Sequence, residues 1–188
     1  MKNLVSVIMN CYNGEEYLEK SLKSIIFQKY DKWELIFWDN QSTDNSKKIF
    51  DSFANPNFKY YLSDEHTSLY EARNLACEKA NGDYIAFLDC DDEWHENFLS
   101  QREIFFNNKF YDYSYSNSYL FFEKSNKKIL HTNKKLLNGL IYDYLAKDYL
   151  VTISSLIIKK NLLKDVGLFN PAFNIIGDFD FVMKLSKT

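Results

Sequence analysis

The sequence predicts an α/β fold: a doubly wound, mainly parallel sheet with helices on both faces and a more irregular second half. Three observations indicate this. Short apolar runs rich in β-branched and aromatic residues recur through the first 110 residues, and longer segments with helically spaced apolar residues lie between them. Beyond about residue 110 this alternation breaks down. Strands that alternate with helices form parallel sheets with right-handed crossovers.

The elements of the first part can be placed in order. The predicted strands are residues 4–10, 33–38, 58–62 and 84–88. A first helix over residues 15–28 has acids in its first turn, where the helix dipole favours them. A second helix carries Ile49, Phe50 and Phe53 and follows the capping residues 42–44. A third helix spans residues 69–80 and ends at an Asn-Gly-Asp turn.

The second part has fewer regular signals. Residues 111–122 alternate polar and aromatic side chains and, with residues 127–131, predict a hairpin. A further strand is predicted at residues 154–158, then a short helix at 161–166 and a last helix that begins near Asp178. No linker or repeat interrupts the chain, so we expect one domain over residues 1–188.

Composition and charge exclude several classes of protein. Apolar residues make up 46% of the chain, which excludes a disordered or fibrous protein. The net charge of −3 disfavours nucleic-acid binding, which needs a basic surface. The longest apolar runs are too short to cross a bilayer, and the N-terminus has no signal-peptide pattern. The three cysteines lack zinc-site spacing, so we expect reduced thiols in a cytoplasmic protein.

Polar residues gather where the predicted strands end. Ligands of open parallel sheets bind at the carboxyl ends of the strands. The side chains expected at this edge are Asn10, Tyr12 and Asn13 after the first strand, Asp39 and Asn40 after the second, and Asp89, Asp91 and Asp92 after the fourth. Cys11 and Cys90 also lie at the ends of strands that we expect to be neighbours. We therefore predict that an oxidant could join these two thiols.

The acidic cluster at residues 89–92 is the most specific of these features. Alternating carboxylates after a strand can hold a hard cation, and Mg²⁺ or Mn²⁺ fits because both leave positions for substrate phosphates. Such a cation would stabilise a departing diphosphate. A solvated acidic turn that caps the next helix is the alternative, and the cluster by itself leaves both open.

Four segments of the chain resemble one enzyme family. They are residues 5–13 (VSVIMNCYN), 38–44 (WDNQSTD), 72–92 (from ARN to the acidic cluster) and 176–181 (IGDFDF). Each resembles a motif of the family 2 glycosyltransferases, which have the GT-A fold, and the four occur in the family's order. The resemblance implies a nucleotide-binding half, residues 1–110, and an acceptor-side half, residues 111–188. Relatives often continue past the last motif, so we expect the chain to be truncated at its C-terminus.

The resemblance also implies a role for each matching residue. Nucleotide binding is implied for Asn10, Tyr12, Asp39, Asn40, Arg73 and Asp89. The ring of Tyr12 would stack on the base. Asp91 and Asp89 match the Asp-X-Asp pair that holds the metal, and Asp178 matches the general base.

These roles predict an inverting, metal-dependent transfer from a nucleotide-diphosphate sugar to an acceptor hydroxyl. Asp178 would take the hydroxyl proton, and Mn²⁺ or Mg²⁺ would stabilise the leaving diphosphate. The expected partners are a UDP-sugar and a glycan or lipid-linked acceptor of surface-glycan synthesis. A lipid-linked acceptor implies peripheral contact with the inner face of the membrane, although no amphipathic anchor is evident in the sequence.

The sequence departs from the family pattern at two positions. Asn40 stands where many relatives have a second acid, so the base of the nucleotide is less well defined than the fold. Gly177 stands where an acid often precedes the general base, and a possible acceptor contact is thereby lost.

Other interpretations are open for single residues and for the whole chain. Tyr12 could pack in the core, Arg73 could pair with an acid of its own helix, and Asp178 could cap the last helix. The three histidines, including His66, are expected at surface or turn positions. A nucleotidyltransferase is disfavoured because residues 11–16 are acidic rather than basic and glycine-rich. A non-catalytic nucleotide-sugar sensor or binding module is the third possibility.

Overall fold

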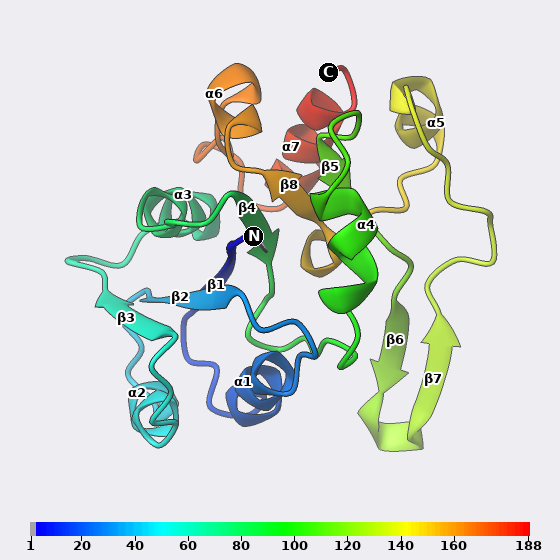
Figure 1. The fold of residues 1–188 in the computed structure, drawn as a ribbon. Coiled ribbons are helices and arrows are strands. Elements are labelled where there is room, and N and C mark those ends of the chain that lie inside the picture. The colour runs from blue at the N-terminus through cyan, green and yellow to red at the C-terminus, as the bar shows by residue number, and fades with distance from the viewer. Residues whose placement is uncertain (1–2) are drawn as a thin grey trace.

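A six-stranded sheet forms the centre of the molecule (Figure 1). The computed structural model describes residues 3–188. The strands lie in the order β3 (Phe58–Leu62), β2 (Trp33–Asp39), β1 (Val5–Cys11), β4 (Tyr84–Phe87), β8 (Ile157–Lys159) and β5 (Tyr113–Ser114). The first four are parallel, β8 runs antiparallel to β4, and β5 runs antiparallel to β8. The predicted α/β architecture with a mainly parallel sheet is confirmed.

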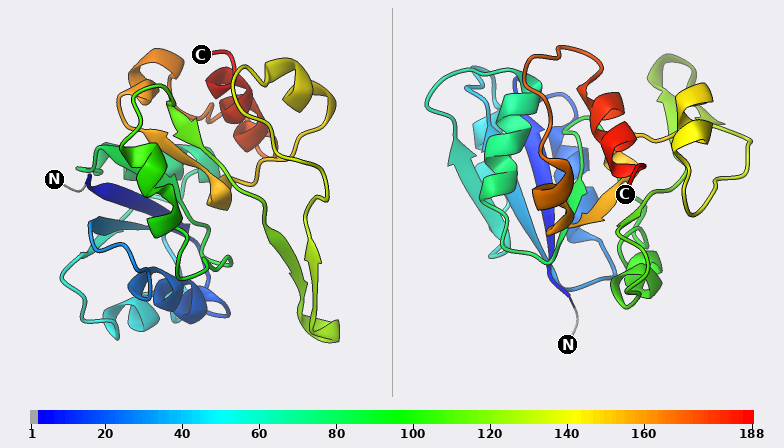
Figure 2. Two further views of the ribbon diagram at one scale, coloured as in Figure 1. Left: turned by 45° about the vertical axis from the view of Figure 1, so that its right-hand side comes forward. Right: turned by 90° about the horizontal axis from the view of Figure 1, so that it is seen from above.

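Helices cover both faces of this sheet, as predicted (Figures 1 and 2). On one face α1 (Leu18–Ile26), α2 (Ser46–Asp51) and α4 (Glu103–Phe106) enclose one buried cluster. On the other face α3 (Leu69–Glu78), α5 (Tyr142–Lys147), α6 (Leu162–Val166) and α7 (Gly177–Leu185) enclose a second. Every residue of β1 and β2 is buried, which explains why these strands read as continuous apolar runs instead of alternating ones.

Helix α1 begins at Leu18, later than the predicted start at residue 15. Residues 13–15 instead bind the loop that precedes α2. The backbone amide of Asn13 donates to Ser42 Oγ over 3.0 Å, and the Glu15 carboxylate accepts from the backbone amide of Asn45 over 2.9 Å. These polar side chains therefore join the two loops at the carboxyl edge of the sheet and do not form the first helical turn.

The second half differs from the prediction in two places. The predicted 111–122 strand is two strands: β5 joins the central sheet, whereas β6 (Tyr119–Phe122) pairs with β7 (Lys127–Leu130) in a separate hairpin. The alternation of polar and aromatic residues continues past the end of β5 to residue 116, so the pattern gave no sign of the break. The predicted 154–158 strand begins instead with a 3₁₀ turn, η3 (Ile153–Ser155), before β8. Among the described residues, no helix is both long enough and apolar enough to span a membrane.

Candidate functional site

The acidic segment leaves the end of β4 as a tight, anchored turn. The Asp92 amide donates to the Asp89 carbonyl over 3.1 Å, which closes the turn. From α1, Ser21 Oγ donates to the carbonyl of Asp92 over 2.7 Å. From η3, Ser154 Oγ accepts from the Asp89 amide over 3.1 Å. Residues distant in the sequence thus fix the backbone of this turn, which is typical of a preorganised binding loop.

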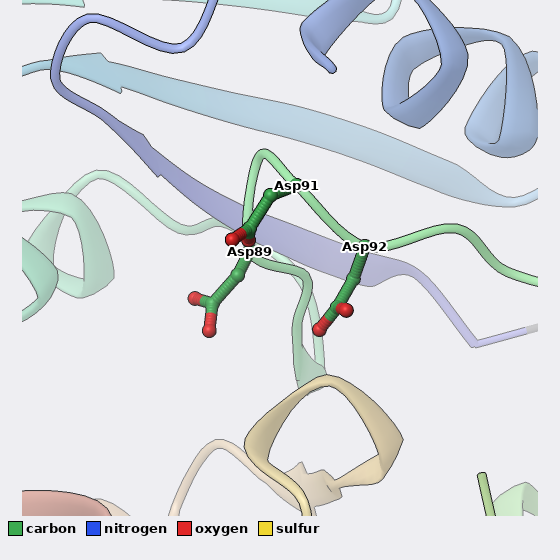
Figure 3. Close-up of side chains that lie close together, drawn as sticks. All are labelled: Asp89, Asp91 and Asp92. Carbon is green, nitrogen blue, oxygen red and sulfur yellow. The ribbon is translucent and has the colours of Figure 1, made fainter. Parts of the chain in front are cut away.

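Three carboxylates of this turn lie close enough to share one cation. Asp89, Asp91 and Asp92 each offer an oxygen atom, and these atoms lie within 4.8 Å of one another (Figure 3). Asp92 was not among the predicted ligands. Partial desolvation by the surrounding protein raises the pKa of the Asp92 carboxyl, and the charges of Asp89 and Asp91 raise it further. Crowded oxygen donors of like charge fit a hard divalent cation such as Mg²⁺ or Mn²⁺.

Arg73 connects this turn to the predicted general base. Its side chain is only 2% exposed. Nη2 lies 2.6 Å from Asp89 Oδ1, and Nη1 lies 2.5 Å from Asp178 Oδ1. Its guanidinium therefore pairs with two carboxylates from other parts of the chain, not with an acid of its own helix. A direct contact between Arg73 and the nucleotide stays a prediction.

Asp178 lies in the first turn of α7, next to the acidic turn. Burial raises the pKa of its carboxyl, and the Asp89 carboxylate adds to this effect while Arg73 opposes it. The N-cap of α7 is Ile176, so Asp178 does not cap the helix. A raised pKa is what a carboxylate needs in order to accept a proton from a substrate.

The glycine before Asp178 has a structural reason. A Cβ atom on Gly177 would lie 2.5 Å from the ring of Tyr70, far inside van der Waals contact. That ring is held in place because its hydroxyl donates to the Ile175 carbonyl over 2.9 Å. Tyr70 therefore occupies the space that an acidic side chain at residue 177 would need.

A second group of predicted residues lies at the ends of β1 and β2. We call Asn10, Tyr12, Asp39 and Asn40 the strand-end cluster. The Tyr12 ring is 52% exposed, so it does not pack in the core. The Asn10 side chain is buried, and neither of its polar atoms has a partner within residues 3–188. Buried polar atoms of this kind are normally satisfied by a ligand or by water. Asn10 and Tyr12 are thus available to a bound molecule.

Asp39 and Asn40 make contacts within the protein. Asp39 Oδ1 accepts from the Ser42 amide over 2.7 Å, and its Oδ2 accepts from the Tyr60 hydroxyl over 2.6 Å. The Asn40 side chain binds Thr67 twice: Nδ2 donates to the Thr67 carbonyl over 2.9 Å, and Oδ1 accepts from the Thr67 amide over 3.2 Å. Asn40 thereby holds the loop between β3 and α3 against the strand-end cluster. Contacts of Asp39 and Asn40 with a nucleotide stay predictions.

His66 is exposed on this loop, as we expected, and it contacts the strand-end cluster. Its ring lies against that of Tyr12, with 4.2 Å between the centroids. Nδ1 lies 2.9 Å from the Asn40 carbonyl. Because a carbonyl only accepts, this contact needs a proton on Nδ1, and Nε2 of that tautomer is then an acceptor. No sequence signal marks His66, since its position depends on contacts 26 residues away.

The predicted proximity of Cys11 and Cys90 is confirmed. A Cβ atom on Gly14 would lie 2.9 Å from the Cys11 sulfur and 3.0 Å from the Cys90 sulfur. A hydrogen bond from the Cys90 thiol lowers the pKa of Cys11 to about 7. Because Cys11 lies between Asn10 and Tyr12, and Cys90 between Asp89 and Asp91, their proximity brings the strand-end cluster next to the acidic turn. An oxidative cross-link between them stays a prediction.

A surface cavity lies elsewhere, away from these residues. It has a volume of about 750 Å³ and is lined by residues at the opposite end of β4, among them Gly82, Tyr84, Lys160 and Lys164. Its position at the amino ends of the strands is not where open parallel sheets bind ligands. None of the predicted site residues lines it.

Known proteins include relatives that match about half of this chain. WfgD of Escherichia coli, named as a UDP-Glc:alpha-D-GlcNAc-diphosphoundecaprenol beta-1,3-glucosyltransferase, is 37% identical over 99 residues, which are 53% of this chain and 39% of WfgD. The chain thus spans less than half of that relative.

Two solved structures of other proteins share the fold of this chain. TarS of S. aureus in complex with UDP-GlcNAc has a TM-score of 0.72 at 20% identity, over 97% of this chain and 52% of TarS. The mannosyltransferase PcManGT of Pyrobaculum calidifontis, solved with GDP-Man and Mn²⁺, has a TM-score of 0.69 at 20% identity, over 92% of this chain and 49% of PcManGT.

The family itself is defined by a pattern that runs through both halves of the site. The pattern of glycosyl transferase family 2 matches residues 6–178, from the second residue of β1 to Asp178. It therefore includes the strand-end cluster, the acidic turn and the buried Arg73. With the GT-A architecture and this match along most of its length, the chain belongs to glycosyl transferase family 2.

Proposed function

We propose that this chain holds the donor site and the catalytic base of an inverting, divalent-metal-dependent glycosyltransferase. The observation that carries the proposal is the buried Arg73, which joins the acidic turn at Asp89 to Asp178. Leaving-group stabilisation and proton abstraction need these two carboxylates close together. A protein that only sensed nucleotide sugars would have no need for a buried base beside the cation site.

The donor is a nucleotide-diphosphate sugar, with a UDP-sugar favoured. WfgD is named for UDP-Glc, and TarS was solved with UDP-GlcNAc, whereas PcManGT was solved with GDP-Man. The acceptor is a hydroxyl of a surface glycan that is being assembled, and the name of WfgD supports a lipid-linked one. We place the reaction at the cytoplasmic face of the membrane, in keeping with three free thiols.

The nucleoside would lie against the strand-end cluster at the ends of β1 and β2. Tyr12 offers an exposed ring for stacking on the base, and His66 offers Nε2 as an acceptor beside it. Asn10 offers a buried amide whose polar atoms have no partner within the described residues. Asp39 and Asn40 act chiefly by holding neighbouring segments in place: Asp39 binds Tyr60, and Asn40 binds Thr67.

The acidic turn would hold Mn²⁺ or Mg²⁺ through Asp89, Asp91 and Asp92. When bound there, the cation supplies Lewis-acid stabilisation of the leaving diphosphate. Arg73 keeps the Asp89 and Asp178 carboxylates at fixed positions. Asp178 accepts the proton of the acceptor hydroxyl as its oxygen attacks the anomeric carbon from the face opposite the diphosphate, and the configuration inverts.

Substitution Asp91→Ala tests the cation site. Affinity for UDP in the presence of Mn²⁺ is expected to fall at least about tenfold, because one of three cation ligands is lost. Thermal-shift assays with UDP, dTDP, GDP and CMP, with and without Mn²⁺, measure the change and identify the base. The matched control is Asp165→Ala on the exposed side of α6, which should leave every shift unchanged. An Mn²⁺-dependent shift of wild-type size in Asp91→Ala would refute the cation site.

The rate of transfer should depend on pH through Asp178. The carboxylate must be ionised to accept a proton, and burial raises its pKa above the ordinary value. The rate is therefore expected to fall as the pH drops through this raised pKa, at a pH above the value of about 3.9 for an unperturbed aspartate. The profile of kcat/KM against pH measures this limb, and UDP–Mn²⁺ affinity over the same range separates it from loss of donor binding. A limb at or below the ordinary value would remove Asp178 as the base.

A further inference from the structure

The β6–β7 hairpin stands apart from the central sheet (Figures 1 and 2). It is a separate two-stranded sheet, and all four residues of β6 are exposed. Three of the four residues of β7 are exposed as well. An isolated two-stranded hairpin is only marginally stable in water, so this one is expected to have a surface on which it rests.

Both faces of the hairpin combine apolar and basic side chains. On one face Leu120 pairs with Ile129, and Phe122 pairs with Lys127. On the other face Phe121 pairs with Lys128, whose ammonium lies 5.6 Å from the centre of the phenyl ring. Phe121 and Phe122 are 45% and 48% exposed. Each face thus carries an aromatic ring beside a lysine, the combination found where proteins meet the headgroups of a bilayer.

The charge of this segment is opposite to that of the whole chain. Residues 119–135 contain five lysines and one glutamate, whereas the chain has a net charge of −3. The one acid, Glu123, lies 3.7 Å from Lys20 and accepts from the Tyr17 hydroxyl over 3.3 Å. Lys124, Lys127 and Lys128 form no ion pair with any carboxylate of residues 3–188. Three cations therefore face solvent next to the exposed rings.

We propose that the β6–β7 hairpin docks this domain onto an anionic phospholipid bilayer. The aromatic and aliphatic side chains would enter the headgroup region, and the lysines would reach lipid phosphates. A bilayer fits better than a protein groove because the apolar side chains are spread over both faces and the free charges have one sign. The contact of Glu123 with Tyr17 and Lys20 ties the hairpin to the start of α1, close behind Tyr12, so docking would hold the donor site beside the membrane.

Vesicle co-sedimentation of the whole chain tests the proposal without any measurement of transfer. We expect binding to vesicles of phosphatidylcholine with phosphatidylglycerol, loss of binding to pure phosphatidylcholine, and weakening as salt increases. The triple variant Lys124→Glu, Lys127→Glu, Lys128→Glu should bind at least about tenfold more weakly. The double variant Phe121→Ser, Phe122→Ser should show a loss of similar size, because it removes the apolar area that would enter the headgroup region.

Matched controls make the result specific. Lys32, Lys48 and Lys164 are exposed and lie outside the hairpin, so their replacement by Glu changes the net charge equally and should leave most of the binding intact. Phe27→Ser removes an exposed ring from the end of α1 and should have no effect. Circular dichroism and the UDP–Mn²⁺ thermal shift confirm that each variant is folded and binds donor.

Two results would overturn the proposal. One is vesicle binding that is absent, or that the control variants reduce as much as the hairpin variants do. The other is light scattering that finds a dimer of the wild-type chain and a monomer of the hairpin variants, since the hairpin would then bind a second copy. Neither result depends on whether the chain transfers sugar.

Discussion

Replacing Asp178 with asparagine is expected to lower the rate of sugar transfer by about 10²–10⁴-fold, the contribution that a positioned general base makes. Asparagine has the shape of aspartate, and its oxygen can still accept from Arg73 Nη1, which now lies 2.5 Å from Asp178 Oδ1. The side chain would keep its place but could no longer take a proton from the acceptor. Donor binding should therefore change little, and cation affinity should fall only by the factor that couples the charge of Asp178 to the cation site.

Single-turnover transfer and calorimetry of UDP–Mn²⁺ binding separate these two effects. Asp180→Asn is a close control because Asp180 lies in the same first turn of α7 and pairs with Lys184 over 2.6 Å. That variant should transfer sugar at nearly the wild-type rate. Transfer by Asp178→Asn within a few-fold of wild type would show that another group takes the proton.

Replacing Arg73 with methionine should cost about 3 kcal/mol of unfolding free energy, at the lower end of the range for a broken buried ion pair. The substitution leaves Asp89 and Asp178 without their cation, although these side chains are 34% and 29% exposed and so remain partly solvated. The loss should shrink as the pH falls, because protonated carboxyls no longer need a partner. Transfer should fall too, since neither carboxylate would be held in position.

Denaturant unfolding over a range of pH measures this stability. Arg102→Met is the informative comparison: Arg102 is also buried, but its guanidinium donates to the carbonyls of Phe98 and Ser155. Its loss should be far less sensitive to pH over the range where carboxyls titrate. The double variant Arg73→Met, Asp178→Asn should lose less stability than the two single losses add up to, because one stranded charge is removed. Equal pH dependence in the two arginine variants would refute this account of Arg73.

The regular part of the fold could be predicted because its signals are local. Strand β3 has the predicted bounds, β2 and β4 differ from prediction by one residue at their C-terminal ends, and β1 is shifted by one residue at both ends. Each of these strands contributes alternate residues to clusters on the two faces of the sheet, so their apolar runs are unambiguous. The start of α1 was wrong because Glu15 is used by the loop before α2, a contact that no local pattern reports.

The site shows the same division between local and distant information. The acidic turn is contiguous in the chain, so its carboxylates could be found from the sequence, apart from the share that Asp92 takes. Arg73 could be named only through a resemblance, and its partners lie 16 and 105 residues away. His66 contacts Tyr12 because Asn40 binds the adjacent Thr67, and this depends on how one loop folds back on another.

The arginine shared between two carboxylates makes the cation site and the base thermodynamically linked. The negative charge of Asp89 is one of the influences that raise the pKa of Asp178. A cation on Asp89 would offset that charge and favour the ionised form of Asp178, so donor loading would prepare the base for its proton. Linkage is reciprocal: protonation of Asp178 should weaken cation affinity by the same factor. The cellular concentration of cation-bound donor would then govern the ionised fraction of Asp178 as well as the occupancy of the donor site.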